Sequence, residues 1–136
     1  RNGVDRPVGE TGNDFVCALG GGWVEYRLPA PAAVDATRLV FDSNLNRNGT
    51  SCHHNILSSY PLKAPANGMP GTLVRAFRIE ARTPEGGWHT VVRVTDNRRR
   101  MVKVPLDITT DALRLIPEAL WDAAATEARL FAWDIA

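Results

Sequence analysis

Short segments in which apolar and polar residues alternate run through most of this 136-residue chain. Because successive side chains of a β-strand point to opposite faces, such alternation predicts strands with one buried face. The clearest example places Phe77, Ile79 and Ala81 between charged residues. The alternating segments are 23–28, 38–42, 77–82, 88–95, 100–106, 111–116 and 129–135. Seven short strands without a sustained helical period predict an all-β antiparallel sandwich.

The last alternating segment and the connections between segments lead to further predictions. We expect Phe131, Trp133 and Ile135 to face the core together. Turns are indicated at Pro29-Ala30-Pro31, Asp96-Asn97 and Ile116-Pro117, and at 84–87, which is typical of a β-hairpin. The Ala-rich segment 118–128 could form a short helix or a turn. One long connection remains, from residue 44 to about residue 72, and loops of such length are usually functional or mobile.

Length and charge limit the classes of function. A chain of 136 residues matches one domain, and its 16 basic residues nearly balance its 15 acidic residues. The small net charge predicts no attraction to nucleic acid, and no apolar run approaches the roughly 20 residues that span a bilayer. The chain starts without methionine at Arg1. We therefore expect residues 1–136 to be a single domain that belongs to a longer protein.

The long connection begins with a polar cluster that includes Cys52, His53 and His54. A tetrahedral zinc site needs three or four converging ligands, whereas adjacent side chains on an extended chain point apart. A Cys-His nucleophile needs an oriented base and an oxyanion site, which neighbours in sequence do not supply. We therefore favour a polar contact loop. Cys17 and Cys52 could form a disulfide, although two buried thiols are the preferred alternative.

The order of the strand motifs resembles the discoidin, or coagulation factor 5/8 type C, family. The resemblance covers nearly the whole chain and rests on segments 22–28, 77–81, 87–91, 112–116 and 128–135. It implies a galactose-binding-like jelly-roll β-sandwich of about eight strands. It also implies a module without catalysis of its own, with carbohydrate as the ligand most often bound by this fold.

A second similarity concerns segments 40–47, 69–80 and 112–117, which look like the C-terminal domain appended to some bacterial FAD-dependent oxidoreductases. That similarity implies an upstream catalytic domain as partner and FAD held only there. Gly20-Gly21-Gly22 runs directly into an expected strand and does not open a helix, so no dinucleotide-binding fingerprint is present in the sequence. We expect no cofactor in this domain apart from a structural calcium ion.

Sugar binding needs an aromatic face together with amide, guanidinium or imidazole donors. The candidate ligand residues in loops are Asn44, Asn46, Arg47, His53, His54, Tyr60, Arg99 and Trp121. The triplet Arg98, Arg99 and Arg100 could contact an anionic group. Each candidate also has a structural alternative: Trp121 and Tyr60 could anchor loops, and the arginines could form a solvated edge that discourages strand pairing.

Hard oxygen donors lie near the start of the chain, where many discoidin-like domains hold calcium. Asp5 and Asp14, assisted by Asn2 and Asn13, are the candidate ligands, and the alternative is that the two carboxylates cap turns. Arg47 could instead form an ion pair with Asp42 or Asp134 that shapes the long loop.

Overall fold

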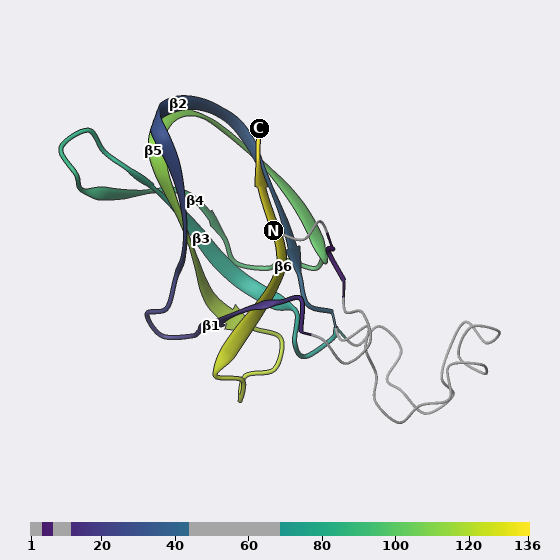
Figure 1. The fold of residues 1–136 in the computed structure, drawn as a ribbon. Helices are drawn as coiled ribbons and strands as arrows, with labels where there is room; N and C mark the ends of the chain where they lie inside the picture. The colour runs from purple at the N-terminus through teal and green to yellow at the C-terminus, as the bar shows by residue number, and fades with distance from the viewer. Residues whose placement is uncertain (1–3, 7–11, 44–68) are drawn as a thin grey trace, which may run out of the picture.

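The computed structural model describes residues 4–6, 12–43 and 69–136. These residues form six strands: β1 (Phe15–Ala18), β2 (Val24–Phe41), β3 (Val74–Arg82), β4 (Trp88–Val94), β5 (Met101–Leu120) and β6 (Glu127–Ile135). All pair antiparallel in one sheet of order β1-β6-β2-β5-β3-β4 (Figure 1). Within the described ranges there is no helix, and therefore none that could cross a membrane. The predicted all-β antiparallel class is confirmed.

The two long strands bend, and this bend turns one sheet into two layers. The first part of β2 pairs with the last part of β5 beside β3, whereas the end of β2 pairs with β6 and with the start of β5. The pairing of β2 with β5 shifts between Arg27 and Ala32, and Asp107 on β5 has a positive φ of 51°. Figure 1 shows both ribbons arching over together at one end. The sheet therefore folds over itself into a sandwich.

This bend corrects the prediction of a turn at Pro29-Ala30-Pro31. The three residues lie inside β2, at the point where its pairing with β5 is interrupted. Proline has no backbone N–H and is tolerated in strands where the ladder is broken. The prolines therefore mark a corner inside one strand and do not separate two strands.

The described ranges contain six strands where about eight were expected, because local alternation does not show where a strand bends. Segments 23–28 and 38–42 both belong to β2, and segments 100–106 and 111–116 both belong to β5. The short strand β1 was not predicted. The expected helix or turn in 118–128 is a turn, since residues 118–120 complete β5 and the following residues connect it to β6 without a helix. The hairpin at 84–87 is confirmed between β3 and β4.

The hydrophobic core lies between the two layers. Phe77, Ile79 and Ala81 are buried as predicted. The ring of Phe41 on β2 lies 5.3 Å from that of Phe77 on β3, so the two layers meet there. Each large apolar side chain that is fully buried contributes roughly 1.5–3 kcal/mol to folding.

Strand β6 departs from the predicted alternation. Leu130 and Trp133 are buried, whereas Phe131 is only partly buried. The cause is a bulge: Val40 of β2 pairs with Ala132 and the next residue, Phe41, pairs with Leu130. The extra residue changes the face to which Phe131 points. The prediction that Phe131 shares the core face with Trp133 is therefore wrong.

Candidate functional site

Three connections meet at one end of the sandwich. They precede β3 (69–73), join β4 to β5 (95–100) and join β5 to β6 (121–126). Backbone hydrogen bonds tie them together: Trp121 N–H to Leu73 O (3.1 Å), Asp122 N–H to Gly71 O (3.0 Å) and Asn97 N–H to Arg75 O (2.8 Å). The three connections therefore form one fixed surface, which we call the end surface.

Asn97 organises this surface from inside. Asn97 is only 6% exposed, and its side-chain amide donates to Val74 O (2.8 Å) and Arg99 O (3.0 Å). Its side-chain oxygen accepts a hydrogen bond from Arg99 N–H (3.0 Å). The sequence indicated only a turn at Asp96-Asn97, since the partners on β3 depend on tertiary pairing. A buried polar side chain with all these bonds holds a loop in one conformation.

Trp121, a predicted ligand residue, lies on the end surface and acts as an anchor. Its indole N–H donates to Asn97 O (2.8 Å), and the side chain packs partly buried against the core. The guanidinium carbons of Arg75 and Arg98 lie 5.9 Å and 5.2 Å from the centre of its ring. The contacts of Trp121 thus agree with the alternative that it anchors a loop. Two cationic side chains also lie beside its aromatic ring.

The arginine triplet divides into two roles. Arg98 pairs with Asp96 (3.1 Å), and Arg99 is exposed. Arg100 turns inward: it donates to the backbone oxygen of Asp5 and lies over the ring of Phe131 at 5.8 Å. Of these three arginines, Arg98 and Arg99 are therefore placed to meet a ligand at the end surface.

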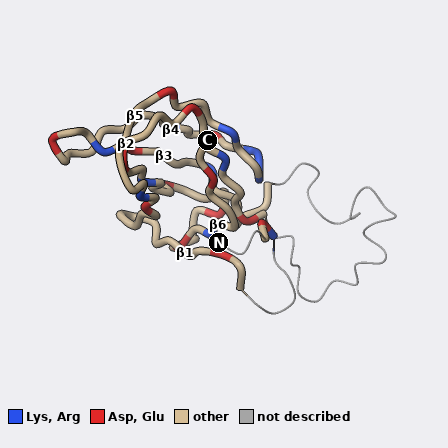
Figure 2. The backbone as a smooth tube through the Cα atoms, turned by 45° about the horizontal axis from the view of Figure 1, so that its top comes forward, with Lys and Arg blue, Asp and Glu red and all other residues tan. Residues whose placement is uncertain are grey.

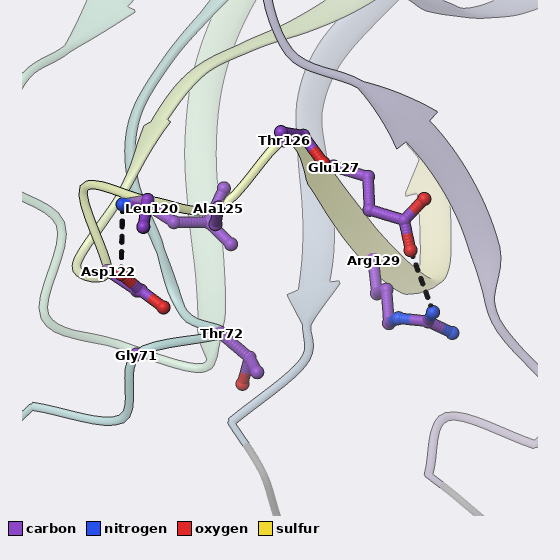
Figure 3. A pocket seen from close by; sticks show the side chains of 9 residues that line it. Gly71, Thr72, Leu120, Asp122, Ala125, Thr126, Glu127 and Arg129 are labelled. Carbon is purple, nitrogen blue, oxygen red and sulfur yellow. Dashed lines mark hydrogen bonds and ion pairs between the residues drawn. The ribbon is translucent and has the colours of Figure 1, made fainter.

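A cavity of about 300 Å³ adjoins these loops (Figure 3). Its polar lining includes Thr72, Asp122, Glu127 and Arg129. Asp122 accepts a hydrogen bond from Ala124 N–H (2.9 Å). Arg129 pairs with Glu127 (2.9 Å) and with Asp14 (2.6 Å), and the hydrogen bond that it donates to Asp14 raises the pKa of Arg129. The cavity therefore offers fixed acceptors and one permanently charged donor.

The other predicted ligand residues, Asn44, Asn46, Arg47, His53, His54 and Tyr60, lie outside the described residues, as does Cys52. Their roles stay predictions. Cys17 is buried, and burial raises the pKa of its thiol. Both alternatives for Cys17 and Cys52 stay predictions, because Cys52 lies outside the described residues. Asp134, one proposed partner of Arg47, pairs with Arg38 (2.6 Å).

The two candidate calcium ligands have arginine partners. Asp5 lies 3.4 Å from Arg38, and Asp14 lies 2.6 Å from Arg129. In the described part of the chain, no group of three or more His, Cys, Asp or Glu residues is arranged to hold a metal ion. Calcium binding by Asp5 and Asp14 stays an untested prediction.

An aromatic cluster on the sheet face was missed by the sequence interpretation. The guanidinium carbon of Arg114 lies 4.6 Å from the ring centre of Trp23 and 3.8 Å from that of Trp88. Its Nε donates to Glu25 (2.9 Å), the residue opposite it on β2. Both tryptophans begin alternating segments, so each could be assigned to a strand, but alternation does not reveal which strands lie side by side.

No family model matches the sequence, and no curated protein matches it either. Solved structures with a similar fold include the family 32 carbohydrate-binding module of Streptococcus pneumoniae EndoD, with TM-score 0.61, 18% identity and coverage of 90% of this chain and 74% of that chain. Chitosan-binding module 1 of a Paenibacillus sp. IK-5 chitosanase/glucanase gives TM-score 0.60 and 12% identity over 90% and 75% of the two chains. The family 32 module of AlyQ, in complex with 4,5-unsaturated mannuronic acid, gives 0.58 and 11% over 90% and 76%.

At these identities the comparisons establish the fold alone. The predicted jelly-roll sandwich of galactose-binding-like fold is confirmed as a fold, with six strands in the described residues where about eight were expected. The similarity to a flavoenzyme C-terminal domain is not supported by these neighbours, and the FAD-containing partner stays a prediction.

Proposed function

We propose that this chain is a non-catalytic carbohydrate-binding module that contacts glycan through the end surface. The observation that carries the proposal is the cavity of about 300 Å³, which is lined by the connection before β3, the connection between β5 and β6, and the start of β6. Its volume is at the lower end of the range for ligand pockets, roughly 300–1,000 Å³, which suits one or two sugar units.

The groups around the cavity suit the chemistry of sugars. Sugar hydroxyl groups both donate and accept hydrogen bonds, and they need partners whose positions are fixed before binding. The carboxylates of Asp122 and Glu127 can accept, and the guanidinium of Arg129 can donate. Each already has a neighbour that holds it in place. Structural neighbours described as carbohydrate-binding modules support the same role.

The proposal is tested by affinity electrophoresis and calorimetry of the 136-residue chain against a panel of soluble polysaccharides. We expect saturable binding to at least one polymer, weakened several-fold by Glu127→Ala because a cavity acceptor is lost. Glu85→Ala is the matched control, since Glu85 is an exposed carboxylate in the β3–β4 hairpin. A folded chain that binds no polymer, or equal loss in both variants, would contradict the proposal.

A second candidate is a docking domain attached to an upstream catalytic domain, including the FAD-dependent oxidoreductase expected above. Exposed apolar side chains favour it: Phe15 and Val16 on the edge strand β1 are 52% and 43% exposed. Such side chains can cover a neighbouring domain. The test is the visible absorption spectrum of the intact gene product, in which flavin bands would support the flavoenzyme partner and a colourless protein would contradict it.

A further inference from the structure

The inference concerns the class of glycan, and it rests on the proposed function. We infer that the end surface selects an acidic polysaccharide, whose anionic group binds to the guanidinium groups of Arg75 and Arg98 beside Trp121 and to that of the exposed Arg99, the next residue along the chain.

The first step is the crowding of positive charge at one indole. The guanidinium carbons of Arg75 and Arg98 lie 5.9 Å and 5.2 Å from the same ring centre. Arg98 has a carboxylate partner, Asp96, at 3.1 Å. Arg75 is exposed and forms no ion pair with any residue of the described ranges. Two guanidinium groups at one ring, of which only Arg98 has a carboxylate partner among the described residues, leave a positive potential that an anion would neutralise.

The second step is the contrast with the other arginines. On the sheet faces, arginines are matched to carboxylates: Arg38, Arg78, Arg82, Arg93, Arg114 and Arg129 each form an ion pair. Arg99, like Arg75, is exposed and has no such partner among the residues that are described. The end surface therefore differs from the sheet faces in having guanidinium groups available for a ligand.

The third step is rigidity. One buried residue, Asn97, fixes the backbone at both Arg75 and Arg99. Its backbone N–H donates to Arg75 O, and its side chain makes two hydrogen bonds with the backbone of Arg99. The ring of Trp121 is fixed in turn by its bond to Asn97 O. Holding charged groups on a fixed backbone reduces the entropy lost when a ligand binds.

The fourth step is the distribution of charge along the described part of the chain. Figure 2 shows basic stretches of the tube gathered at one side of the molecule, whereas red and blue segments are interspersed elsewhere.

The chemistry favours a sugar that carries a carboxylate or a sulfate ester. A guanidinium group presents a planar fork of donors that matches the oxygens of either anion, and such charge-assisted hydrogen bonds are about twice as strong as neutral ones. The net charge of the chain is only +1, so general attraction to polyanions is weak. Selection for an acidic glycan must therefore come from this local cluster.

The experiment compares matched polymers in affinity electrophoresis and calorimetry at about 0.15 M salt, where exposed charges are screened beyond about 8 Å. Polygalacturonate is paired with its carboxyl-reduced form, and dextran sulfate with dextran. We expect at least one acidic polymer to bind roughly tenfold more tightly than its neutral match. The pair that shows the difference identifies the anion as carboxylate or sulfate.

Arginine variants show which residues cause the preference for an acidic polymer. Arg75→Gln combined with Arg99→Gln should abolish the preference for the acidic polymer, whereas Arg27→Gln should preserve it. Arg27 is a suitable control because its side chain is 76% exposed on β2, away from the end connections. Its partner Glu25 still forms an ion pair with Arg114 when Arg27 is replaced. Equal loss in the control would mean non-specific attraction and would overturn the inference.

The failure of the inference can be distinguished from that of the proposed function. Equal binding of acidic and neutral polymers by the unchanged chain overturns the acidic specificity but leaves the carbohydrate-binding function standing. Absence of binding to every polymer overturns both.

Discussion

At the scale of the residue, Asn97 is the side chain on which the end surface depends most. It makes three side-chain hydrogen bonds to the backbone while buried. We expect Asn97→Ala to reduce the free energy of unfolding by about 2–4 kcal/mol, because Val74 O and the Arg99 backbone groups lose their partner. Urea denaturation measures the change, with the exposed Thr109→Ala as control. A loss below about 0.5 kcal/mol would show that water replaces the amide.

Glu25 supplies a pH dependence at the same scale. Its hydrogen bond from Arg27, followed by that from Arg114, lowers the pKa of Glu25 from its ordinary value of 4.5. A carboxyl group whose folded pKa is depressed stabilises the fold above its unfolded pKa and loses that contribution as pH falls through the folded value. The unfolding free energy of the native chain should therefore fall more between about pH 7 and about pH 3 than that of Glu25→Gln.

Denaturation curves at several pH values test this expectation. The difference between the two proteins should be about 1 kcal/mol or less near neutral pH, because the pair lies near the surface. It should disappear in acid. A difference that is the same at every pH would mean that Glu25 acts through packing alone.

At the scale of the element, the corner in the long strands explains what the sequence could and could not predict. Alternation predicted the faces of β3 correctly, because β3 itself contains no extra residue between Phe77 and Ala81. It failed at Pro29-Ala30-Pro31, since a proline pair indicates an interrupted ladder without showing whether the strand resumes. It also failed at Phe131, where a bulge depends on the partner strand.

The same limit applies to the end surface. Trp121 and Arg99 could be selected as loop residues by their chemistry, but Arg75 lies on an alternating strand, at its second residue. Its nearness to Trp121 follows from the pairing of β3 with the end of β5, where Val74 is opposite Leu120. Long-range register of this kind is absent from local sequence patterns.

Asp107 provides a test of the corner. Its φ of 51° is left-handed, a conformation that aspartate tolerates and a β-branched residue does not. We expect Asp107→Val to lower the unfolding free energy by about 1–2 kcal/mol and Asp107→Gly to leave it unchanged or raise it slightly. Urea denaturation measures both. Equal stability of the Val and Gly variants would show that the corner does not require this backbone conformation.

At the scale of the whole molecule, one folded sheet makes both layers, so neither layer can exist without the other. β2 and β5 contribute residues to both, and the contact of Phe41 with Phe77 joins the layers across the core. Loss of packing at this contact should therefore weaken the entire domain and not one face of it. The argument predicts a single cooperative unfolding transition, as is usual for a domain of this size.

Phe77→Ala tests this cooperativity. Phe77 is fully buried, and removing a buried aromatic ring costs about 3–5 kcal/mol through lost transfer energy and the cavity left behind. Because domains of this size are stable by only about 5–15 kcal/mol, the urea midpoint should fall steeply while the transition stays single and its slope is unchanged. Phe15→Ala, at a site that is 52% exposed, should move the midpoint little. Two separate transitions followed by circular dichroism and Trp fluorescence would contradict the description of one sheet folded over a shared core.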